Sequence, residues 1–395
     1  MRILIAGGGV GGLTAALALL RTGHEVRVFE QAARFEDIGA GVQISPNGMK
    51  VLDRLGVSAR VGRDAFRPRA QEFRLGRSGQ RIFEIPLRSE AINRWGGDYL
   101  HIHRADLLSA LLEAVRDLSP ESLINGHQVT EYLQGENGIR LKFASGESAS
   151  GDLLIGADGI HSAVRAQMLG PEKPRFTGHV AWRTVVPIAR LGDYPPPETA
   201  CVWAGSGRHA VTYRLRRGSL ANFVGVVERD EPGEESWGAP GAREDAKADF
   251  PGWHPVIRRI IDEAPVLLRW PLYDRAPLPK WSEGRVVLVG DACHPMLPFL
   301  AQGAVMAIED AYVLAAEITR SASLPAALDA YERARKPRAT RVQETARQNA
   351  RIFHRSNPFM KLGTYGPMMA AGRLLPGIIH GRHDWLYGQD VTAAA

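Results

Sequence analysis

The segment "RILIAGGGVGGLTAALALLRTGHEVRVFE", residues 2–30, decides the fold of this chain. Its first five residues predict a short buried strand, and the apolar residues that continue to Leu20 predict a helix. The closing "EVRVFE" predicts a second strand. A strand, a helix and another strand within about thirty residues are typical of the start of a parallel sheet. We therefore expect an α/β fold.

Glycines join the first strand to the first helix. Gly7, Gly9 and Gly12 have the G-x-G-x-x-G spacing, and Glu30 ends the second strand. The glycine spacing alone is weak evidence, but its position between a strand and a helix predicts a dinucleotide-binding turn. Glycines let the backbone approach a pyrophosphate, whose charge the helix N-terminus stabilises. A carboxylate at Glu30 can accept the ribose hydroxyl protons and would repel a 2′-phosphate, which indicates FAD or NAD rather than NADP.

Composition restricts the class of protein. The chain has 395 residues, of which 45% are hydrophobic and 23% charged, and this is ordinary for a globular protein. The net charge of +6 favours small anions over nucleic acid. Cys201 and Cys293 lie far apart and indicate no disulfide framework, so we expect a cytoplasmic protein. The apolar stretch 362–379 contains two prolines and Arg373, which argues against a membrane span.

The strand pattern changes near residue 176. "GHVAWRTVVPI", "TACVWAG", "RHAVTYRLRRG" and "LANFVGVVE" predict short antiparallel strands, exposed in part on one face. The segment "GRVVLVGD" again has the pattern of a buried parallel strand. We therefore expect that a β-rich unit is inserted into the unit that contains the parallel sheet. The end of the chain is mostly helical, and Pro337 is expected to end or kink one helix.

Two more motifs follow buried strands. "GADGIHSAVR" places Asp158 after one strand, and "GDACHP" places Asp291 after another. Together with "GGGVGG", they resemble the motifs of the single-component (group A) FAD-dependent aromatic hydroxylases. This group includes salicylate hydroxylase, 3-hydroxybenzoate 6-hydroxylase and 6-hydroxynicotinate monooxygenase. The resemblance covers almost the whole chain and implies a Rossmann-like FAD-binding domain of the GR2 flavoprotein type, with an inserted antiparallel substrate sheet and a helical C-terminus.

The domain boundaries follow from the strand pattern and the resemblance. We expect an FAD-binding domain in two parts, a β-rich substrate domain and a C-terminal helical segment. The FAD-binding domain comprises residues 1–175 and 273–330, the substrate domain residues 176–272, and the C-terminal segment residues 331–395. Residues 74–97 are expected to contribute to the substrate sheet.

The resemblance also implies roles for individual residues. Those expected to hold the ADP half of FAD are Gly7, Gly9, Gly12 and Glu30. Those expected near the phosphates and the ribityl chain are Arg104, Asp158 and Asp291. Those expected to line the flavin are Ala40, Gly41 and Val42. Gln302 and Gly303 precede a helix whose N-terminus can stabilise negative charge on reduced flavin.

Cys293 and His294 invite a different interpretation, a Cys/His nucleophile. We interpret them as packing and turn residues, because the sequence supplies no third residue to orient the histidine. The chain has no HExxH or CxxC motif, and His101 and His103 have the spacing of a sheet-face pair. We therefore predict no metal site.

The resemblance implies that NADH, in preference to NADPH, reduces FAD, and that O2 then forms a flavin hydroperoxide that oxygenates an electron-rich ring. A phenolate ring is more electron-rich than a phenol ring. Because the pKa of a phenol is about 10, a histidine that removes its proton is useful at neutral pH. The resemblance assigns this base to His209 of "GRHAVTYRL" and pairs it with Tyr213. Residues i and i+4 of a strand face the same side, so both can reach one ring.

The expected substrate is a phenolic or hydroxylated heteroaromatic compound that carries a carboxylate. Arg214, Arg216 and Arg217 could bind that carboxylate or could equally be solvated turn charges. The alternative function is a flavin-dependent reductase or oxidase that acts on a non-aromatic substrate.

The basic run "RARKPRATRVQETARQNAR" raises the possibility of a nucleic-acid or membrane partner. We interpret this run as a solvated helix face because Glu332 and Glu344 are interleaved with it. We therefore expect neither partner. A homodimer formed through the apolar C-terminal segment stays open.

Overall fold

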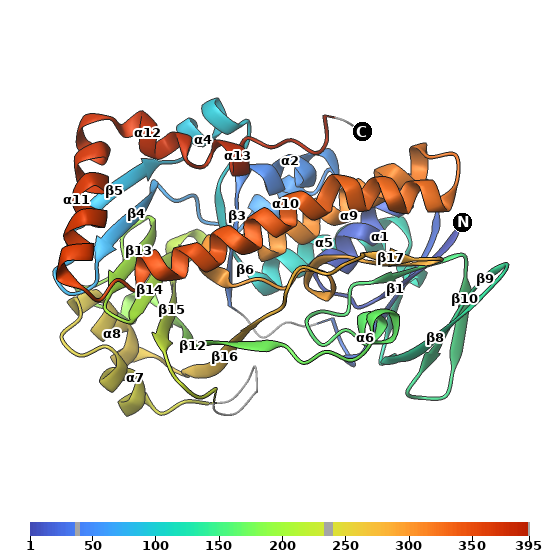
Figure 1. Cartoon of the computed structure of the whole chain (residues 1–395), viewed down its shortest axis with the longest axis horizontal. Coiled ribbons are helices and arrows are strands. Elements are labelled where there is room, and N and C mark those ends of the chain that lie inside the picture. The colour runs from blue at the N-terminus through green and yellow to red at the C-terminus, as the bar shows by residue number, and fades with distance from the viewer. Residues whose placement is uncertain (36–39, 233–239, 394–395) are drawn as a thin grey trace.

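The computed structural model describes residues 1–35, 40–232 and 240–393 (Figure 1). In these residues the strands form sheets of six, seven, three and two strands. The mixture of a parallel sheet, antiparallel sheets and a helical C-terminus confirms the predicted α/β fold class.

The first sheet is built on the opening segment of the chain. In spatial order its six strands are β17 (Ser282–Glu283), β18 (Val286–Leu288), β11 (Leu153–Gly156), β1 (Arg2–Ala6), β2 (Glu25–Glu30) and β7 (Leu123–Asn125). The neighbours pair in parallel except β17 and β18. The central strands β1 and β11 are buried almost throughout, which is the pattern expected of a parallel sheet covered on both faces.

Helices and a small sheet cover the parallel sheet. The helices that pack together are α1 (Val10–Arg21), α5 (Arg104–Leu118) and α9 (Gly303–Arg320). The small antiparallel sheet consists of β8 (Val129–Gly135), β9 (Gly138–Phe143) and β10 (Ser148–Gly151), and it contacts β1 and β11. Side chains from all these elements share one hydrophobic core.

The seven-stranded sheet forms the other half of the molecule. In spatial order its strands are β16 (Leu268–Asp274), β12 (Arg175–Pro187), β15 (Leu220–Glu228), β14 (Arg208–Leu215), β13 (Ala200–Gly205), β4 (Ala70–Leu75) and β5 (Arg81–Pro86). The neighbours are antiparallel except β13 and β4. The early contribution to this sheet comes from residues 70–86, whereas residues 89–95 form a helix.

The two faces of the seven-stranded sheet have different surroundings. A second core of Trp, Phe and Ile side chains joins one face to α7 (Arg243–Asp249) and α8 (Pro255–Glu263). Alternate residues of β14 point the other way, and His209, Val211 and Tyr213 line a cavity there. The antiparallel pair β3 (Gly41–Ile44) and β6 (Leu100–His103) contributes to the region between the two large sheets.

The remaining helices are α2 (Pro46–Arg54), α3 (Ser58–Gly62), α4 (Ser89–Trp95), α6 (Ala163–Leu169), α10 (Leu324–Phe353), α11 (Pro358–Leu374), α12 (Pro376–Gly381) and α13 (Asp384–Tyr387). Among the described residues, no helix combines the length and apolar character that a bilayer crossing requires.

The long helix α10 crosses the molecule from the parallel sheet to the seven-stranded sheet (Figure 1). Pro337 lies inside it, so of the two expected effects, a helix end or a kink, the helix end is wrong. A proline removes one backbone donor, but α10 is held on both sides of this position by the ion pairs of Arg335 and Arg338. Other basic residues of the run also have internal partners, among them Arg347 with Asp274.

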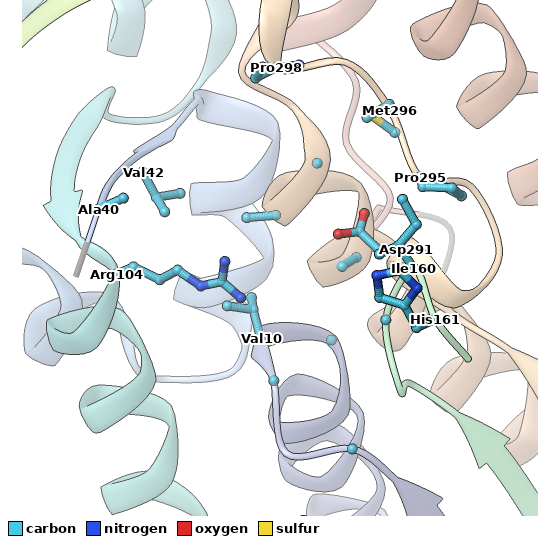
Figure 2. A pocket seen from close by; sticks show the side chains of 18 of the residues that line it. Val10, Ala40, Val42, Arg104, Ile160, His161, Asp291, Pro295, Met296 and Pro298 are labelled. Carbon is cyan, nitrogen blue, oxygen red and sulfur yellow. The ribbon is translucent and has the colours of Figure 1, made fainter. Parts of the chain in front are cut away.

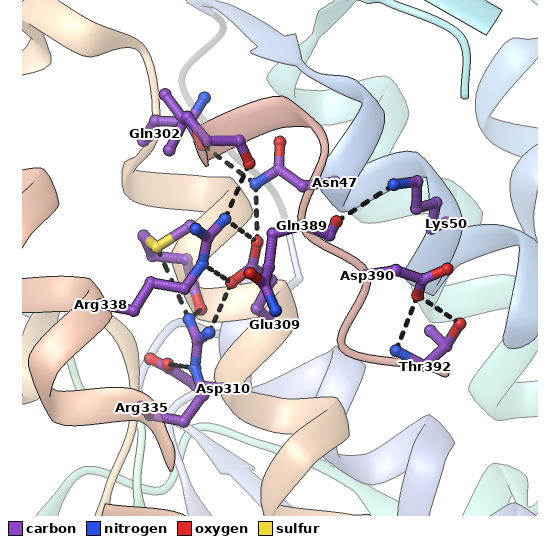
Figure 3. Close-up of polar contacts among 12 residues, drawn as sticks. Asn47, Lys50, Gln302, Glu309, Asp310, Arg335, Arg338, Gln389, Asp390 and Thr392 are labelled. Atoms are coloured by element: carbon purple, nitrogen blue, oxygen red, sulfur yellow. Dashed lines mark hydrogen bonds and ion pairs between the residues drawn. The ribbon is translucent and has the colours of Figure 1, made fainter. Parts of the chain in front are cut away.

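A buried polar network joins α9 to α10 (Figure 3). The Arg335 guanidinium donates to Asp310 at 2.8 Å and to Glu309 at 2.5 Å, and all three side chains are almost fully buried. Arg338 donates to both oxygens of Glu309. Burial raises the pKa of Glu309, but Arg335 and Arg338 outweigh it and hold the pKa below its ordinary value. The network therefore consists of charged groups that compensate each other inside the protein.

Replacement of Arg335 tests this compensation. We expect Arg335→Met to lower the free energy of unfolding by about 3–5 kcal/mol, because Glu309 and Asp310 would be left as buried carboxylates with less compensation. Urea unfolding measures the change. The matched control is Arg333→Met on the same helix, since Arg333 is 72% exposed and lies 3.7 Å from Asp329. Equal effects of the two substitutions would contradict the prediction.

Candidate active site

A cavity of about 620 Å³ lies between the two large sheets. The glycine turn, Glu30 and the start of α9 line one part of it, and strands β12, β14, β15 and β16 line the other. The N-termini of α1 and α9 both contribute residues, so two partial positive charges face the same space. Figure 2 shows Arg104 and Asp291 pointing into this cavity from opposite sides.

At two positions of the glycine turn, an added Cβ would clash with a backbone carbonyl oxygen. A Cβ at Gly7 would lie 2.4 Å from the carbonyl oxygen of Ala157, and Gly7 has a φ of +102°. A Cβ at Gly12 would lie 2.0 Å from the carbonyl oxygen of Gly7. At Gly9, by contrast, no atom lies within 4 Å of an added Cβ, and the residue lines the cavity. Gly7 and Gly12 thus shape the turn, and Gly9 leaves its surface open.

The backbone of the turn orients the Glu30 carboxylate. One oxygen accepts a hydrogen bond from the Gly8 N–H at 2.8 Å, and the other accepts from the Ala32 N–H at 2.9 Å. Glu30 also lines the cavity, and each carboxylate oxygen has a further lone pair for a ligand. This arrangement suits recognition of adjacent hydroxyl groups.

Asp158 and Asp291 follow strands β11 and β18 of the parallel sheet and both line the cavity. Asp158 accepts hydrogen bonds from the Ser162 hydroxyl at 2.5 Å and the Val164 N–H at 3.2 Å. Asp291 is open to the cavity. The protein atoms packed around them desolvate both carboxyl groups and raise the pKa of each, although Asp291 keeps surface open to the cavity. Arg165 connects the two turns, since it donates to the carbonyl oxygens of Ala292 and Ile160.

Residues 40–42 and Arg104 lie together because β3 pairs with β6, which leads directly into α5. The backbone N–H of Arg104 donates to the Ala40 carbonyl oxygen at 2.9 Å. The Gly41 N–H donates to the side chain of Asn222 at 2.8 Å, and an added Cβ at Gly41 would lie 2.5 Å from the Tyr213 ring. Asn222 could not be identified from the sequence, because nothing in its segment indicates contact with a residue 181 positions away.

Gln302 immediately precedes α9 and is 1% exposed, yet it lines the cavity beside Gly303. Its amide nitrogen donates to the Ser45 hydroxyl at 2.9 Å, and its oxygen accepts from the Asn47 amide at 3.2 Å. Asn47 also donates to Glu309 at 2.6 Å, as Figure 3 shows. The buried network of α9 and α10 thus extends to the edge of the cavity. Sequence reasoning did not identify Ser45 or Asn47.

His209 and Tyr213 lie on β14 and line the cavity from the seven-stranded sheet. His209 is 1% exposed, and the rings of Phe299 and Phe353 lie 4.9 and 5.1 Å from its ring. Burial lowers the pKa of His209 well below its ordinary value, and it raises the pKa of Tyr213. The structure therefore favours a neutral imidazole and a neutral phenol here.

The arginines that follow Tyr213 do not line the cavity. Arg214, Arg216 and Arg217 form ion pairs with Glu198, Asp106 and Asp64. They are structural and surface charges, so the structure favours the second of the two interpretations of these arginines, charges at a turn, over carboxylate binding. The sequence analysis missed Arg183, which lines the cavity and lies 4.1 Å above the Trp270 ring.

Cys293 and His294 are both buried behind Asp291 in the turn that leads toward α9. Burial raises the pKa of the Cys293 thiol well above its ordinary value, which disfavours a thiolate nucleophile. Nε2 of His294 donates a hydrogen bond to Asp310 at 2.5 Å. Burial lowers the pKa of His294, but Asp310 outweighs this effect and raises it. His294 thus fastens the turn to the buried network, and Cys293 packs in the hydrophobic core.

Comparison with known proteins agrees with this geometry. A family model described as FAD binding domain matches residues 1–346. The chain is 36% identical to 6-hydroxynicotinate 3-monooxygenase of Bordetella bronchiseptica, covering 99% of this chain and 96% of that protein. It is 34% identical to 3-hydroxybenzoate 6-hydroxylase of Polaromonas naphthalenivorans, covering 98% and 96%. The structure of Klebsiella pneumoniae HpxO complexed with FAD and uric acid has a TM-score of 0.85, 29% identity and coverage of 96% and 95%.

The fold and the site define a flavoprotein that binds FAD. The chain belongs to the FAD binding domain family, and its relatives confirm the predicted class of FAD-dependent aromatic-ring monooxygenase. The cavity fits the cofactor. It combines an open glycine surface at Gly9, an oriented carboxylate at Glu30 and two helix N-termini, as a dinucleotide requires.

The glycines give a test of this fit. We expect Gly9→Ala to fold normally but to bind FAD at least about tenfold more weakly, because the new methyl group would face the cavity. Flavin fluorescence titration of the apoprotein measures the affinity. The companion Gly12→Ala should instead lower the melting temperature of the apoprotein, since its methyl group would meet the Gly7 carbonyl. FAD affinity unchanged in Gly9→Ala would refute this placement.

Proposed function

We propose that this enzyme hydroxylates a phenolic or hydroxylated heteroaromatic acid at a ring carbon, with FAD, NADH and O2. The observation that carries the proposal is the single cavity that contains both the dinucleotide-type turn and the His209–Tyr213 pair. The alternative, a reductase or oxidase acting on a non-aromatic substrate, has no specific observation in its favour. The names of the relatives cited above support a hydroxylated aromatic acid as substrate.

The proposal assigns the cofactor to one end of the cavity. In this assignment Gly7, Gly9, Gly12 and Glu30 hold the ADP half, and Arg104, Asp158 and Asp291 contact the phosphates and ribityl chain. Ala40, Gly41 and Val42 line the flavin ring, and Gln302 and Gly303 present the α9 N-terminus to it. Bound FAD supplies the redox chemistry, accepting two electrons from the nicotinamide and activating O2.

The proposal assigns the substrate to the end formed by the seven-stranded sheet. His209 and Tyr213 face the same side of β14, and Arg183 on β12 is a cation in the same space. Arg183 is suited to the carboxylate of the substrate. His209 is suited to accept the proton of the substrate hydroxyl, which leaves an electron-rich ring. Trp270, Leu297 and Phe299 surround this end with apolar surface, which keeps water away.

Replacement of His209 tests the assignment of the base. We expect His209→Asn to bind FAD normally but to hydroxylate about 100-fold more slowly at neutral pH, in the range typical of a lost general base. The rate should recover in part at high pH, where the substrate hydroxyl ionises in solution. The measurement follows NADH consumption, O2 uptake and product together. The substrate panel contains 3-hydroxybenzoate, 6-hydroxynicotinate and salicylate, and full coupled turnover of His209→Asn at neutral pH would remove His209 from this role.

A homodimer is part of the proposal. The surface of α11 and α12 exposes Phe359 by 85%, Leu362 by 73%, Leu374 by 78% and Ile378 by 59%. Apolar side chains gathered in this way on a surface favour association with another surface. We assign this surface to a second copy of the chain, in line with the C-terminal segment noted in the sequence.

Light scattering after size-exclusion chromatography tests the dimer. The wild type should have twice the monomer mass, and the double variant Phe359→Asp, Leu362→Asp should have the monomer mass. Val266→Asp is the control, because Val266 is also an exposed apolar residue at 55% but lies outside α11 and α12. A monomeric wild type would contradict the assignment.

We also assign the protein to the cytoplasm. Cys201 and Cys293 are both free and buried, which suits a reducing compartment.

A further inference from the structure

His209 is the first member of a chain of polar side chains that reaches the protein surface. Its Nδ1 lies 2.6 Å from Nε2 of His354, and Nδ1 of His354 lies 3.0 Å from a carboxylate oxygen of Glu228. The His354 side chain is 2% exposed, whereas that of Glu228 is 55% exposed. The chain therefore begins at the cavity, passes through the interior and ends in solvent.

The fold brings these three residues together from two directions. On the seven-stranded sheet, His209 of β14 pairs with Val226 of β15. Glu228 lies two residues beyond Val226, so the side chains of Val226 and Glu228 are on the same face of β15. His354 arrives from the C-terminus of α10, where its carbonyl oxygen accepts a hydrogen bond from the Gly207 N–H. No sequence motif announces this contact, because His354 is 145 residues away from His209.

The carboxylate determines where the protons of the two imidazoles lie. An ionised carboxylate only accepts hydrogen bonds, so His354 must donate its Nδ1–H to Glu228. Its Nε2 then carries a lone pair and accepts the Nδ1–H of His209. The remaining nitrogen of His209, Nε2, is left with a lone pair for a ligand in the cavity. Glu228 thus prepares His209 as a proton acceptor without touching the substrate.

We propose that His354 and Glu228 carry the proton that His209 takes from the substrate hydroxyl out to solvent. This inference rests on the proposed function. The substrate O–H bond breaks as an N–H bond forms at Nε2 of His209, and the Nδ1 proton of His209 passes to Nε2 of His354. The Nδ1 proton of His354 then passes to Glu228, which releases it to water. After the ring is hydroxylated, a proton from water returns through Glu228 and His354 to Nδ1 of His209 while the Nε2 proton of His209 passes to the product oxygen. This restores the starting state, and no electrons are exchanged.

The surroundings explain why a relay is needed. Burial is the main cause that lowers the pKa of His209 well below its ordinary value, and burial also lowers the pKa of His354, to about 3. Among the described residues, the titratable and charged groups near the relay include His179 on β12, Arg208 on β14 and Glu228 on β15, and the first two disfavour a positive charge on His354. Phe299 and Phe353 add only apolar surface. A stored imidazolium is therefore unfavourable, and a coupled transfer avoids it.

The same region has one other interpretation. His179, Glu228 and His354 have nitrogen and oxygen atoms that all lie within 4.8 Å of one another, a composition that can hold a cation. However, both ring nitrogens of His354 already lie at hydrogen-bonding distance from a neighbour, one from His209 and one from Glu228. The observed contacts therefore favour proton transfer.

Glu228→Gln is the decisive variant, because glutamine can still accept the hydrogen bond of His354 but cannot take its proton. Stopped-flow mixing of the FAD-loaded protein with substrate, in weak buffer with a pH indicator, measures proton release. The substrate is whichever of 3-hydroxybenzoate, 6-hydroxynicotinate and salicylate the wild type hydroxylates. We expect Glu228→Gln and His354→Gln to slow proton release and hydroxylation at least about tenfold at neutral pH, with less difference at high pH. FAD affinity should not change.

Two further variants serve as controls. Glu228→Asp should restore much of the rate, since it restores a carboxylate. Glu147→Gln should behave as the wild type, although Glu147 is likewise an exposed glutamate paired with a cavity histidine, His127, at 2.8 Å.

Three results would count against the relay. If the wild type hydroxylates, and Glu228→Gln and His354→Gln both release protons at the wild-type rate, the relay is overturned and the proposed function is not. Hydroxylation lost in EDTA and regained with Zn²⁺ would make the cluster a metal site and also overturn it. A wild type that hydroxylates no member of a broad panel of hydroxylated aromatic acids would overturn the proposed function, and the relay with it.

Discussion

The arrangement of the site depends on the ion pairs that the Arg335 guanidinium forms with Glu309 and Asp310. A buried charge that loses its partner is costly, so α9 and α10 can occupy only the relative position that keeps all three groups paired. That position also fixes the start of α9, because Glu309 accepts from Asn47 and Asn47 holds Gln302. On the other side, Asp310 accepts from the Gly290 N–H and thereby holds the turn that carries Asp291. One ion-pair cluster thus sets two walls of the cavity.

The two large sheets contribute different physical environments to a single space. The parallel sheet supplies strand ends, helix N-termini and carboxylates, which suit the polar parts of a dinucleotide. The seven-stranded sheet supplies aromatic and aliphatic side chains around a few polar groups, which suit an aromatic ring. Gly41 lies where these environments meet, with its N–H bonded to Asn222 and its Cα against the Tyr213 ring. A side chain at this position would force the two halves apart.

Local patterns were enough to bring the residues at the glycine-turn end of the cavity together, and they placed those at the other end only in part. The glycine turn, Glu30, Asp158 and Asp291 follow strands of a parallel sheet, and such strand ends meet at one edge. His209 and Tyr213 could be placed on one face from the period of a strand. Asn222, Arg183 and His354 could not be placed, because their roles depend on contacts between segments far apart in the sequence. Arg214, Arg216 and Arg217 had two possible roles for the same reason, since the carboxylates that pair with them lie in other segments of the chain.

The helix α10 connects the two ends of the cavity in a way that neither sheet could. Arg335, in its middle, compensates charges beside the nucleotide end, and His354, directly after its last residue, contacts the histidine of the substrate end. Under the proposed function, the end of the cavity that holds the substrate must exclude water, yet an apolar surrounding makes any stored proton unfavourable. These two demands are compatible only if a proton taken from the substrate can leave without resting on a buried group. A path from His209 through His354 to the exposed Glu228 satisfies both demands, because the interior stays neutral and the charge changes where water can solvate it.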